Sequence, residues 1–182
     1  MKPADLFLQR RRIAQAARHI PPGARVLDVG CEEGALFQAL GGAIGPSVGV
    51  DPALAAPVVL GPHRLLPGRF PAEIPEAGPF DVIVMLAVLE HVPPAEAPLV
   101  GEACARLLAP GGRVVITVPS PRVDDILAFL RWIRVVDAET LEEHHGFAPS
   151  DTPALFAGRG FRLSRAGRFQ LGLNNLFVFE KT

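Results

Sequence analysis

The stretch that decides the fold is residues 24–34, ARVLDVGCEEG. Its first half is a short apolar run, which predicts a buried β-strand that ends at Gly30. Its second half carries two glutamates and Gly34, and it leads into an apolar segment that predicts a helix over residues 33–40. A strand that passes through a glycine-containing turn into a helix is typical of the first unit of a parallel α/β sheet.

The rest of the chain extends this pattern. Residues 80–89, FDVIVMLAVL, give the strongest strand signal, because they are apolar, rich in β-branched side chains and unbroken. Further strands are predicted at residues 48–50, 64–66, 113–119, 161–166 and 176–180, and further helices at 1–22, 95–108, 123–136 and 151–158. Alternating strands and helices predict an α/β fold with a parallel, doubly wound sheet. No helix separates the last two strands, so we expect them to form an antiparallel edge.

Composition narrows the class of protein. The chain has 182 residues, 49% of them hydrophobic, which is enough for the core of one domain spanning residues 1–182. A formal net charge of −1 gives no reason to expect nucleic acid or an anionic membrane as partner. The N-terminus has no apolar signal segment, and residues 82–89 are too short an apolar run to span a bilayer. Cys31 and Cys104 match no metal or redox spacing, so we expect two reduced thiols in a cytoplasmic protein.

Three loops at the carboxyl ends of predicted neighbouring strands carry polar residues and glycines suited to a ligand. Ligands of such sheets bind at this edge, where the strand order reverses. Gly30 allows a sharp turn and a close backbone approach. Asp51 lies about twenty residues further on, where an acid accepts hydrogen bonds from ribose hydroxyls, although Asp is also a good helix N-cap. Met85 and Leu86 end the central strand and are expected to form a wall for a base.

Glu32 argues against a dinucleotide. A dinucleotide-binding loop needs a glycine where this chain has Glu32, because the backbone there approaches the pyrophosphate. A carboxylate at that point repels phosphate. It is compatible with a ligand that carries positive charge and no phosphate, and Asp28 at the end of the same strand strengthens this preference.

Several segments, taken in order, carry a family resemblance over nearly the whole chain: VLDVGCEEG, VGVDPAL, GPFDVIVMLAVLEHVPP, LLAPGGRVVITVPSP and GFAPSDTPALFAGRGFRL. Together they resemble the class I methyltransferases that use S-adenosylmethionine (SAM), in the type 11 or ubiquinone-biosynthesis-like group. The resemblance implies transfer of a methyl group from SAM to an oxygen or carbon nucleophile of a small-molecule acceptor, with S-adenosylhomocysteine (SAH) as product. It also implies a Rossmann-like, mostly parallel sheet of seven strands in the order 3-2-1-4-5-7-6.

The resemblance assigns roles to residues at the carboxyl edge of the sheet. Asp28, Gly30 and Gly34 are expected to surround the methionine part of SAM, and Asp51 is expected to hold the ribose. The complete set of expected cofactor-binding residues is Asp28, Gly30, Cys31, Gly34, Asp51, Pro52, Phe70, Met85 and Leu86. This chain departs from the family pattern at Glu32, where the family has glycine, and at Arg69, where it often has an acid that binds the adenine amine.

Metal binding is not expected. The ubiquinone-pathway O-methyltransferases bind a divalent metal with Glu-x-x-Glu-His, and this chain has Ala87 in place of the first glutamate. Glu90 and His91 remain, and they are expected to have a structural role or to line the acceptor pocket.

The candidate general bases are His145 and His91. Methyl transfer from SAM needs alignment and exclusion of water more than proton transfer, so a base helps only when the nucleophile is a weak acid. His145 lies next to His144, and in extended backbone the two side chains point to opposite sides.

The acceptor pocket is expected to form from the N-terminal helix over residues 1–22, the loop after His91 and residues 119–149. That last segment is apolar and basic, which suits an amphiphilic or anionic acceptor. Two alternatives stay open. One is a non-catalytic SAM-binding or methyltransferase-like module, which Glu32 and Arg69 favour. The other is an NAD-dependent oxidoreductase, which Glu32 and the absence of tyrosine disfavour.

Overall fold

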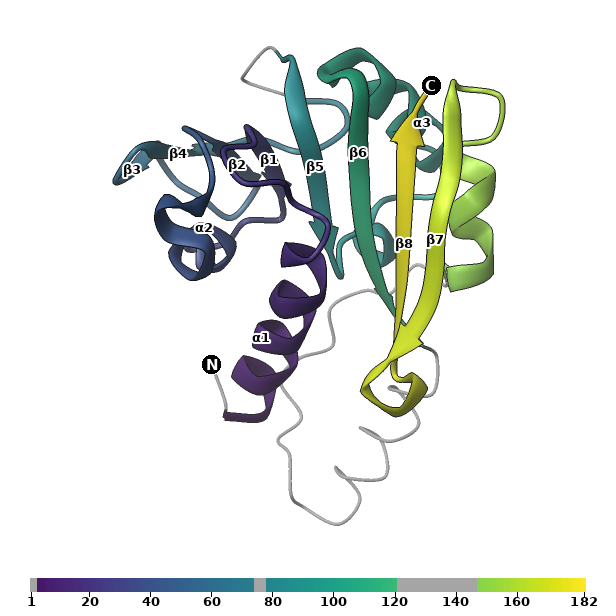
Figure 1. Ribbon diagram of the computed structural model, residues 1–182, viewed down its shortest axis with the longest axis horizontal. Coiled ribbons are helices and arrows are strands. Elements are labelled where there is room, and N and C mark those ends of the chain that lie inside the picture. The colour runs from purple at the N-terminus through teal and green to yellow at the C-terminus, as the bar shows by residue number, and fades with distance from the viewer. Residues whose placement is uncertain (1–2, 74–77, 121–146) are drawn as a thin grey trace.

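The computed structural model describes residues 3–73, 78–120 and 147–182. Figure 1 shows a single twisted sheet with helices packed against it. The elements in chain order are α1 (Pro3–Ala17), β1 (Val26–Val29), α2 (Ala35–Leu40), η1 (Gly41–Ala43), β2 (Val48–Asp51), β3 (Val58–Leu60), β4 (His63–Pro67), β5 (Phe80–Leu86), η2 (Leu89–His91), α3 (Ala97–Leu107), β6 (Leu108–Pro119), η3 (Pro149–Leu155), β7 (Phe161–Phe169), η4 (Gln170–Gly172) and β8 (Asn174–Lys181), where η denotes a 3₁₀ helix.

The sheet has the order β3-β4-β2-β1-β5-β6-β8-β7. Strands β4, β2, β1, β5 and β6 pair in parallel, and β8 runs antiparallel to both β6 and β7. Without β3 this is the seven-stranded order expected from the resemblance, so the predicted fold class is confirmed. The count of seven falls one short, because β3 adds an edge strand antiparallel to β4. Gly61, at φ +57°, makes the tight turn between these two strands.

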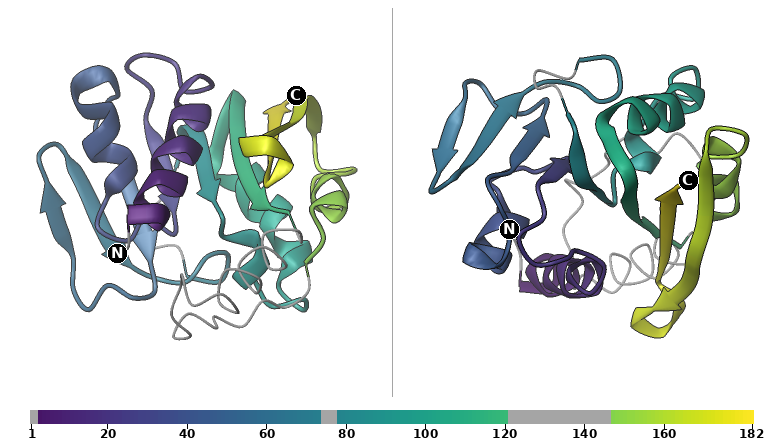
Figure 2. Two further views of the ribbon diagram at one scale, coloured as in Figure 1. Left: turned by 90° about the horizontal axis from the view of Figure 1, so that it is seen from below. Right: turned by 45° about the horizontal axis from the view of Figure 1, so that its top comes forward.

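Both faces of the sheet are covered, as a parallel sheet requires. Alternate strand residues face opposite sides, so each strand contributes to two apolar clusters. One cluster lies under α1 and α2 and includes Val26, Val82, Val84, Val115, Ile13 and Phe37. The other lies under α3 and η3 and includes Leu27, Ile83, Met85, Ile116, Cys104 and Phe156. Figure 2 shows α1 and α2 on one side of the sheet and α3 on the other.

The helix predictions have mixed outcomes. Residues 33–40 and 95–108 become α2 and α3, each slightly shorter than expected. Residues 151–158 form a 3₁₀ helix, η3, which starts two residues earlier and contains Pro153. Proline lacks the backbone N–H that a continued α-helix needs, which accounts for the tighter and shorter element. The predicted helix over 123–136 lies outside the described residues. No helix in the described ranges is long and apolar enough to cross a membrane.

The topology places the candidate site. Strand β1 lies between β2 and β5, and the chain leaves β1 on one side and returns on the other, so the carboxyl ends of these strands surround the point where the strand order reverses. Helix α1 lies near this edge of the sheet, and its N-terminal end extends beyond it (Figure 1).

Candidate functional site

The turn after β1 depends on Gly30. Gly30 has φ +73°, and its N–H donates to the carbonyl of Val50 at 2.9 Å, which joins the turn to β2. A Cβ atom at this position would lie 2.6 Å from Cγ2 of Val88, in the loop after β5. Both the backbone angle and the close approach of Val88 therefore require glycine.

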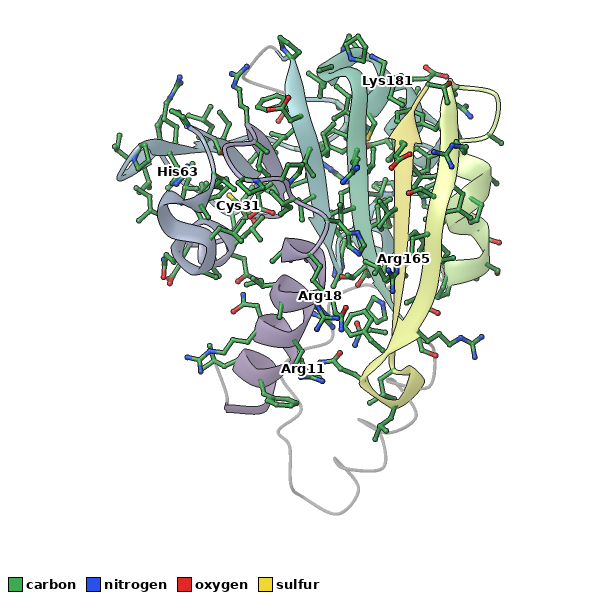
Figure 3. The ribbon with its side chains drawn as sticks, viewed as in Figure 1. Arg11, Arg18, Cys31, His63, Arg165 and Lys181 are labelled. Carbon is green, nitrogen blue, oxygen red and sulfur yellow. The ribbon has the colours of Figure 1, made fainter. Side chains whose placement is uncertain are left out.

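The far end of the same loop depends on Gly34. Gly34 has φ +79° at the start of α2, and its N–H donates to the carbonyl of Cys31 at 2.8 Å. Cys31 is buried in the α1/α2 cluster (Figure 3). Burial, with the nearby carboxylates of Asp28 and Asp51, raises the pKa of the Cys31 thiol, so the thiol stays protonated and is not a nucleophile.

Asp51 orders two loops at once. Its carboxylate accepts the backbone N–H of Glu32 at 2.9 Å and that of Ala53 at 2.8 Å. Residues 52–57 form turns and bends, so the alternative role of Asp51 as a helix N-cap is wrong. Asp51 is 6% exposed, and its side chain is held at the carboxyl end of β2.

Asp28 is the most deeply placed acid of the site. It is 4% exposed. Asp28 lies two residues after Val26 on the same strand, so both side chains face the side of the sheet that α1 and α2 cover. Burial, Asp51 and Glu32, in that order of importance, raise the pKa of Asp28 to about 8. A buried carboxyl with two acidic neighbours favours its neutral form.

Glu32 stands where the family has glycine, and it has φ +46°. Its side chain is exposed and accepts a hydrogen bond from Nε2 of Gln9, on α1, at 3.3 Å. The carboxylate therefore projects to the surface toward α1. A groove of about 630 Å³ begins here and runs between α1 and α2, and its lining includes Arg10, Ile13 and Leu40.

The residues expected near a base differ in exposure. Met85 is fully buried in the α3 cluster, and Phe70 is 7% exposed in the same cluster. Leu86 is half-buried on the opposite face, and Pro52 is exposed. Nε of Arg69 lies 4.0 Å from Oε2 of Glu96, at the start of α3, so the positive charge of Arg69 has an acidic neighbour.

One of the two candidate bases, His91, lies in the loop after β5, beside the acid Glu90. His91 ends the 3₁₀ helix η2 and is half-buried, and Glu90 next to it is 4% exposed. His145 lies outside the described residues. Within the ranges that the structure describes, no group of three or more His, Cys, Asp or Glu side chains forms a metal site.

Two contacts of this site have no signal in the sequence. Val88 packs against Gly30, and Gln9 reaches Glu32 from α1. Both come from segments distant in the chain, and neither residue type points to a ligand. Only covariation among homologues would reveal such contacts.

Known proteins resemble this chain in sequence and in fold. A family model described as a methyltransferase domain matches residues 5–164. A ubiquinone biosynthesis O-methyltransferase of Xylella fastidiosa (strain 9a5c) is 38% identical over 120 residues, which cover 58% of this chain and 46% of that protein. The chain thus spans about half the length of the curated relatives it matches.

Solved structures share the fold at low sequence identity. A TehB-like SAM-dependent methyltransferase from Corynebacterium glutamicum has a TM-score of 0.67 and 18% identity, with all of both chains covered. Magnesium protoporphyrin IX methyltransferase from Synechocystis, solved with bound SAH, has a TM-score of 0.65 and 17% identity, covering 97% of this chain and 83% of that one. The family resemblance seen in the sequence is confirmed, and the chain belongs to the methyltransferase domain family.

Proposed function

We propose that this protein transfers a methyl group from SAM to an oxygen or carbon nucleophile of a small-molecule acceptor. The observation that carries the proposal is the arrangement of Asp28, Glu32 and Asp51 around the turn at Gly30. Three acids surround a backbone turn at the carboxyl edge of the sheet, where family members bind their cofactor.

The residues present fit SAM better than a dinucleotide. SAM carries a sulfonium and an ammonium group and has no phosphate, so acidic side chains favour it. The same side chains repel a pyrophosphate, since like charges at about 4 Å cost about 4 kcal/mol at an effective dielectric constant of 20. Gly30 is exposed and carries no side chain, so its turn offers bare backbone for a close approach of the methionine part.

Each residue has a separate role in this proposal. Asp51 binds the ribose hydroxyls with the lone pairs that its two backbone hydrogen bonds leave available. Gly30, Gly34 and the backbone of Cys31 position the methionine part, while Leu86, Met85, Phe70 and Pro52 are the expected surroundings of the adenine. SAM supplies an electrophilic methyl group on its sulfonium. The protein aligns the acceptor with that methyl group and excludes water.

The acceptor is proposed to be an amphiphilic or anionic small molecule. The groove beside α1 supports the amphiphilic character, since its lining combines the apolar Leu6 and Ile13 with the charged Arg10, Glu32 and Glu33. His91 is the proposed base within the described residues, and His145 is the second candidate. The free, buried thiols of Cys31 and Cys104 fit a cytoplasmic location.

Isothermal titration calorimetry with SAM, SAH, NAD and NADP tests the cofactor assignment. We expect SAM and SAH to bind and the two dinucleotides not to bind. Micromolar binding of NAD would contradict the proposal. A methyl-transfer assay with labelled SAM and a set of amphiphilic phenols and acids then separates an enzyme from a non-catalytic SAM-binding module, which would bind SAM and methylate none of them.

A further inference from the structure

Asp28 is 4% exposed, and among the described residues no backbone or side-chain group donates a hydrogen bond to its carboxyl group. Transfer of an ionised carboxylate from water to such a position is costly unless a positive charge or several donors compensate it. The protonated form of Asp28 is therefore favoured as long as no cation is present.

The groups around Asp28 also favour its neutral form. Strand β2 contributes the acid Asp51, and the loop after β1 contributes the acid Glu32 and the neutral thiol of Cys31. Strand β5 contributes Val84, which is level with Asp28 in the parallel register.

Helix α1 carries the cations Arg10 and Arg12. Arg12 donates to Oδ1 of Asn174 at 3.1 Å, and Arg10 lines the groove between α1 and α2. Neither arginine is among the groups that shift the pKa of Asp28, which burial, Asp51 and Glu32 raise to about 8.

We infer that Asp28 is a neutral acid in the ligand-free protein, that it releases its proton to solvent when SAM binds, and that it thereby favours the sulfonium cofactor over the thioether product. This inference rests on the proposed function. SAM has one positive charge more than SAH, on the sulfur atom. An entering sulfonium stabilises the carboxylate form of Asp28, and the O–H bond of the carboxyl breaks with its electron pair left on oxygen.

Methyl transfer reverses the preference. Once the methyl group has left, the sulfur is a neutral thioether and the charge that stabilised the carboxylate is gone. Asp28 then takes a proton from solvent and returns to its neutral form. Asp28 is therefore a specificity-determining residue that strengthens binding of the reactant cofactor and weakens binding of its product.

The inference has a definite pH signature. When one proton is released on binding, affinity rises by about tenfold for each pH unit below the pKa of the free protein and levels off above it. We therefore expect SAM affinity to rise between pH 6 and pH 7.5, whereas SAH affinity changes much less. The ratio of the SAH and SAM dissociation constants should increase by about twentyfold over this interval.

Isothermal titration calorimetry of the full chain in phosphate and in imidazole tests this directly. Because the two buffers differ in ionisation enthalpy, the difference in measured heat counts the protons released. We expect close to one proton released per SAM bound at pH 6, fewer at pH 7.5, and clearly fewer for SAH. Asp28→Asn keeps the shape of the side chain and should abolish both the proton release and the pH dependence of the SAM-to-SAH ratio.

A second variant keeps the test decisive if Asp28→Asn does not fold. Glu32→Gln removes an exposed acidic neighbour, so Asp28 ionises more readily in the ligand-free protein and fewer protons are released at each pH. SAM binding with equal heats in both buffers would overturn the inference and leave the proposed function intact. Failure of the wild type to bind SAM at any of these pH values would overturn the proposed function as well.

Discussion

Asp51 and the backbone of Glu32 are joined by a hydrogen bond of 2.9 Å, from the N–H of Glu32 to Oδ2 of Asp51. The bond connects the carboxyl end of β2 with the loop that follows β1. Oδ1 of the same carboxylate holds the N–H of Ala53 at 2.8 Å. A residue assigned to the ligand is thus also part of the scaffold of both loops.

Asp51→Ala should therefore affect binding and stability together. Loss of both backbone bonds is expected to lower the free energy of unfolding by about 1–3 kcal/mol. Loss of the ribose contact should reduce SAM affinity at least about tenfold. Asp51→Asn is the matched control, because its amide oxygen can still accept one backbone bond, so it should be more stable than the alanine variant. Unchanged SAM affinity in Asp51→Ala, measured by calorimetry, would contradict the ribose assignment.

Gly30→Ala should destabilise the fold for two separable reasons. The variant has a positive φ and a Cβ that meets Val88 at 2.6 Å. Gly111 has the same φ of +73°, and a Cβ added there would have nothing within 4 Å, so Gly111→Ala measures the cost of the backbone angle alone. We expect about 1 kcal/mol of destabilisation for Gly111→Ala and about 1–3 kcal/mol more for Gly30→Ala. If urea denaturation gives the same loss of unfolding free energy for both variants, the contact with Val88 is relieved by small shifts of its side chain.

Lys181→Met should loosen the end of α3. Nζ of Lys181 donates to the carbonyls of Ala105 and Leu108 at 2.6 and 2.7 Å, which places a positive charge at the C-terminus of the helix. Hydrogen bonds from a charged donor and the interaction with the helix dipole together predict a loss of about 2–3 kcal/mol. Arg162→Met, which removes an ion pair of an exposed side chain with Glu180, is the control and should cost less than about 1 kcal/mol. Similar melting temperatures for the two variants would show that the Lys181 bonds contribute little.

Asp28→Asn should change how stability depends on pH. The folded protein raises the pKa of Asp28 from its usual value of 3.8 to about 8, so the folded state binds the proton more tightly than the unfolded state. The stability from this group is complete below pH 4 and is lost as pH rises toward 8, by up to about 1.4 kcal/mol per pH unit. The asparagine variant lacks this loss, so its stability relative to the wild type should increase from pH 5 to pH 8. If urea denaturation shows the same dependence of stability on pH for the wild type and for Asp28→Asn, Asp28 is not a neutral acid in the folded protein.

Activity should not depend on a divalent metal. Ala87 stands where the metal-binding pattern implied by the sequence resemblance has its first acid, and its backbone is left-handed, with φ +60°. Treatment with EDTA should therefore leave methyl transfer unchanged. A loss of activity that magnesium restores would show that Glu90 and His91 recruit a metal with ligands from elsewhere.

The sequence predicted the fold well where the signal is local and long. Residues 80–89 and 113–119 are apolar over many positions; the first stretch forms strand β5 as far as Leu86, and the second lies within strand β6. The three residues of β3 carry almost no signal, because so short a strand is stable only through its pairing with β4. The apolar pattern of residues 151–158 indicates a helix but not its type, and Pro153 is the residue that favours the 3₁₀ form of η3.

The site was predictable as a set of loops and less so in its details. The order of strands brings Gly30, Asp51 and Leu86 to the same edge, and that order follows from the family pattern. Which of Met85 and Leu86 faces which side depends on strand register, and a shift of one residue exchanges the two. The contacts of Val88 and Gln9 depend on tertiary packing alone.

The position of β8 between β6 and β7 sets the order in which the sheet is completed. Among the described strands, β7 is hydrogen-bonded to β8 alone, yet β7 precedes β8 in the chain. During synthesis β7 emerges first and has no place to dock until β8 has followed it. The two strands should therefore pair first as a hairpin around Gln170–Gly172 and add to β6 as a unit. Docking of this hairpin is expected to be a late event in folding, so variants in its turn should speed unfolding more than they slow refolding.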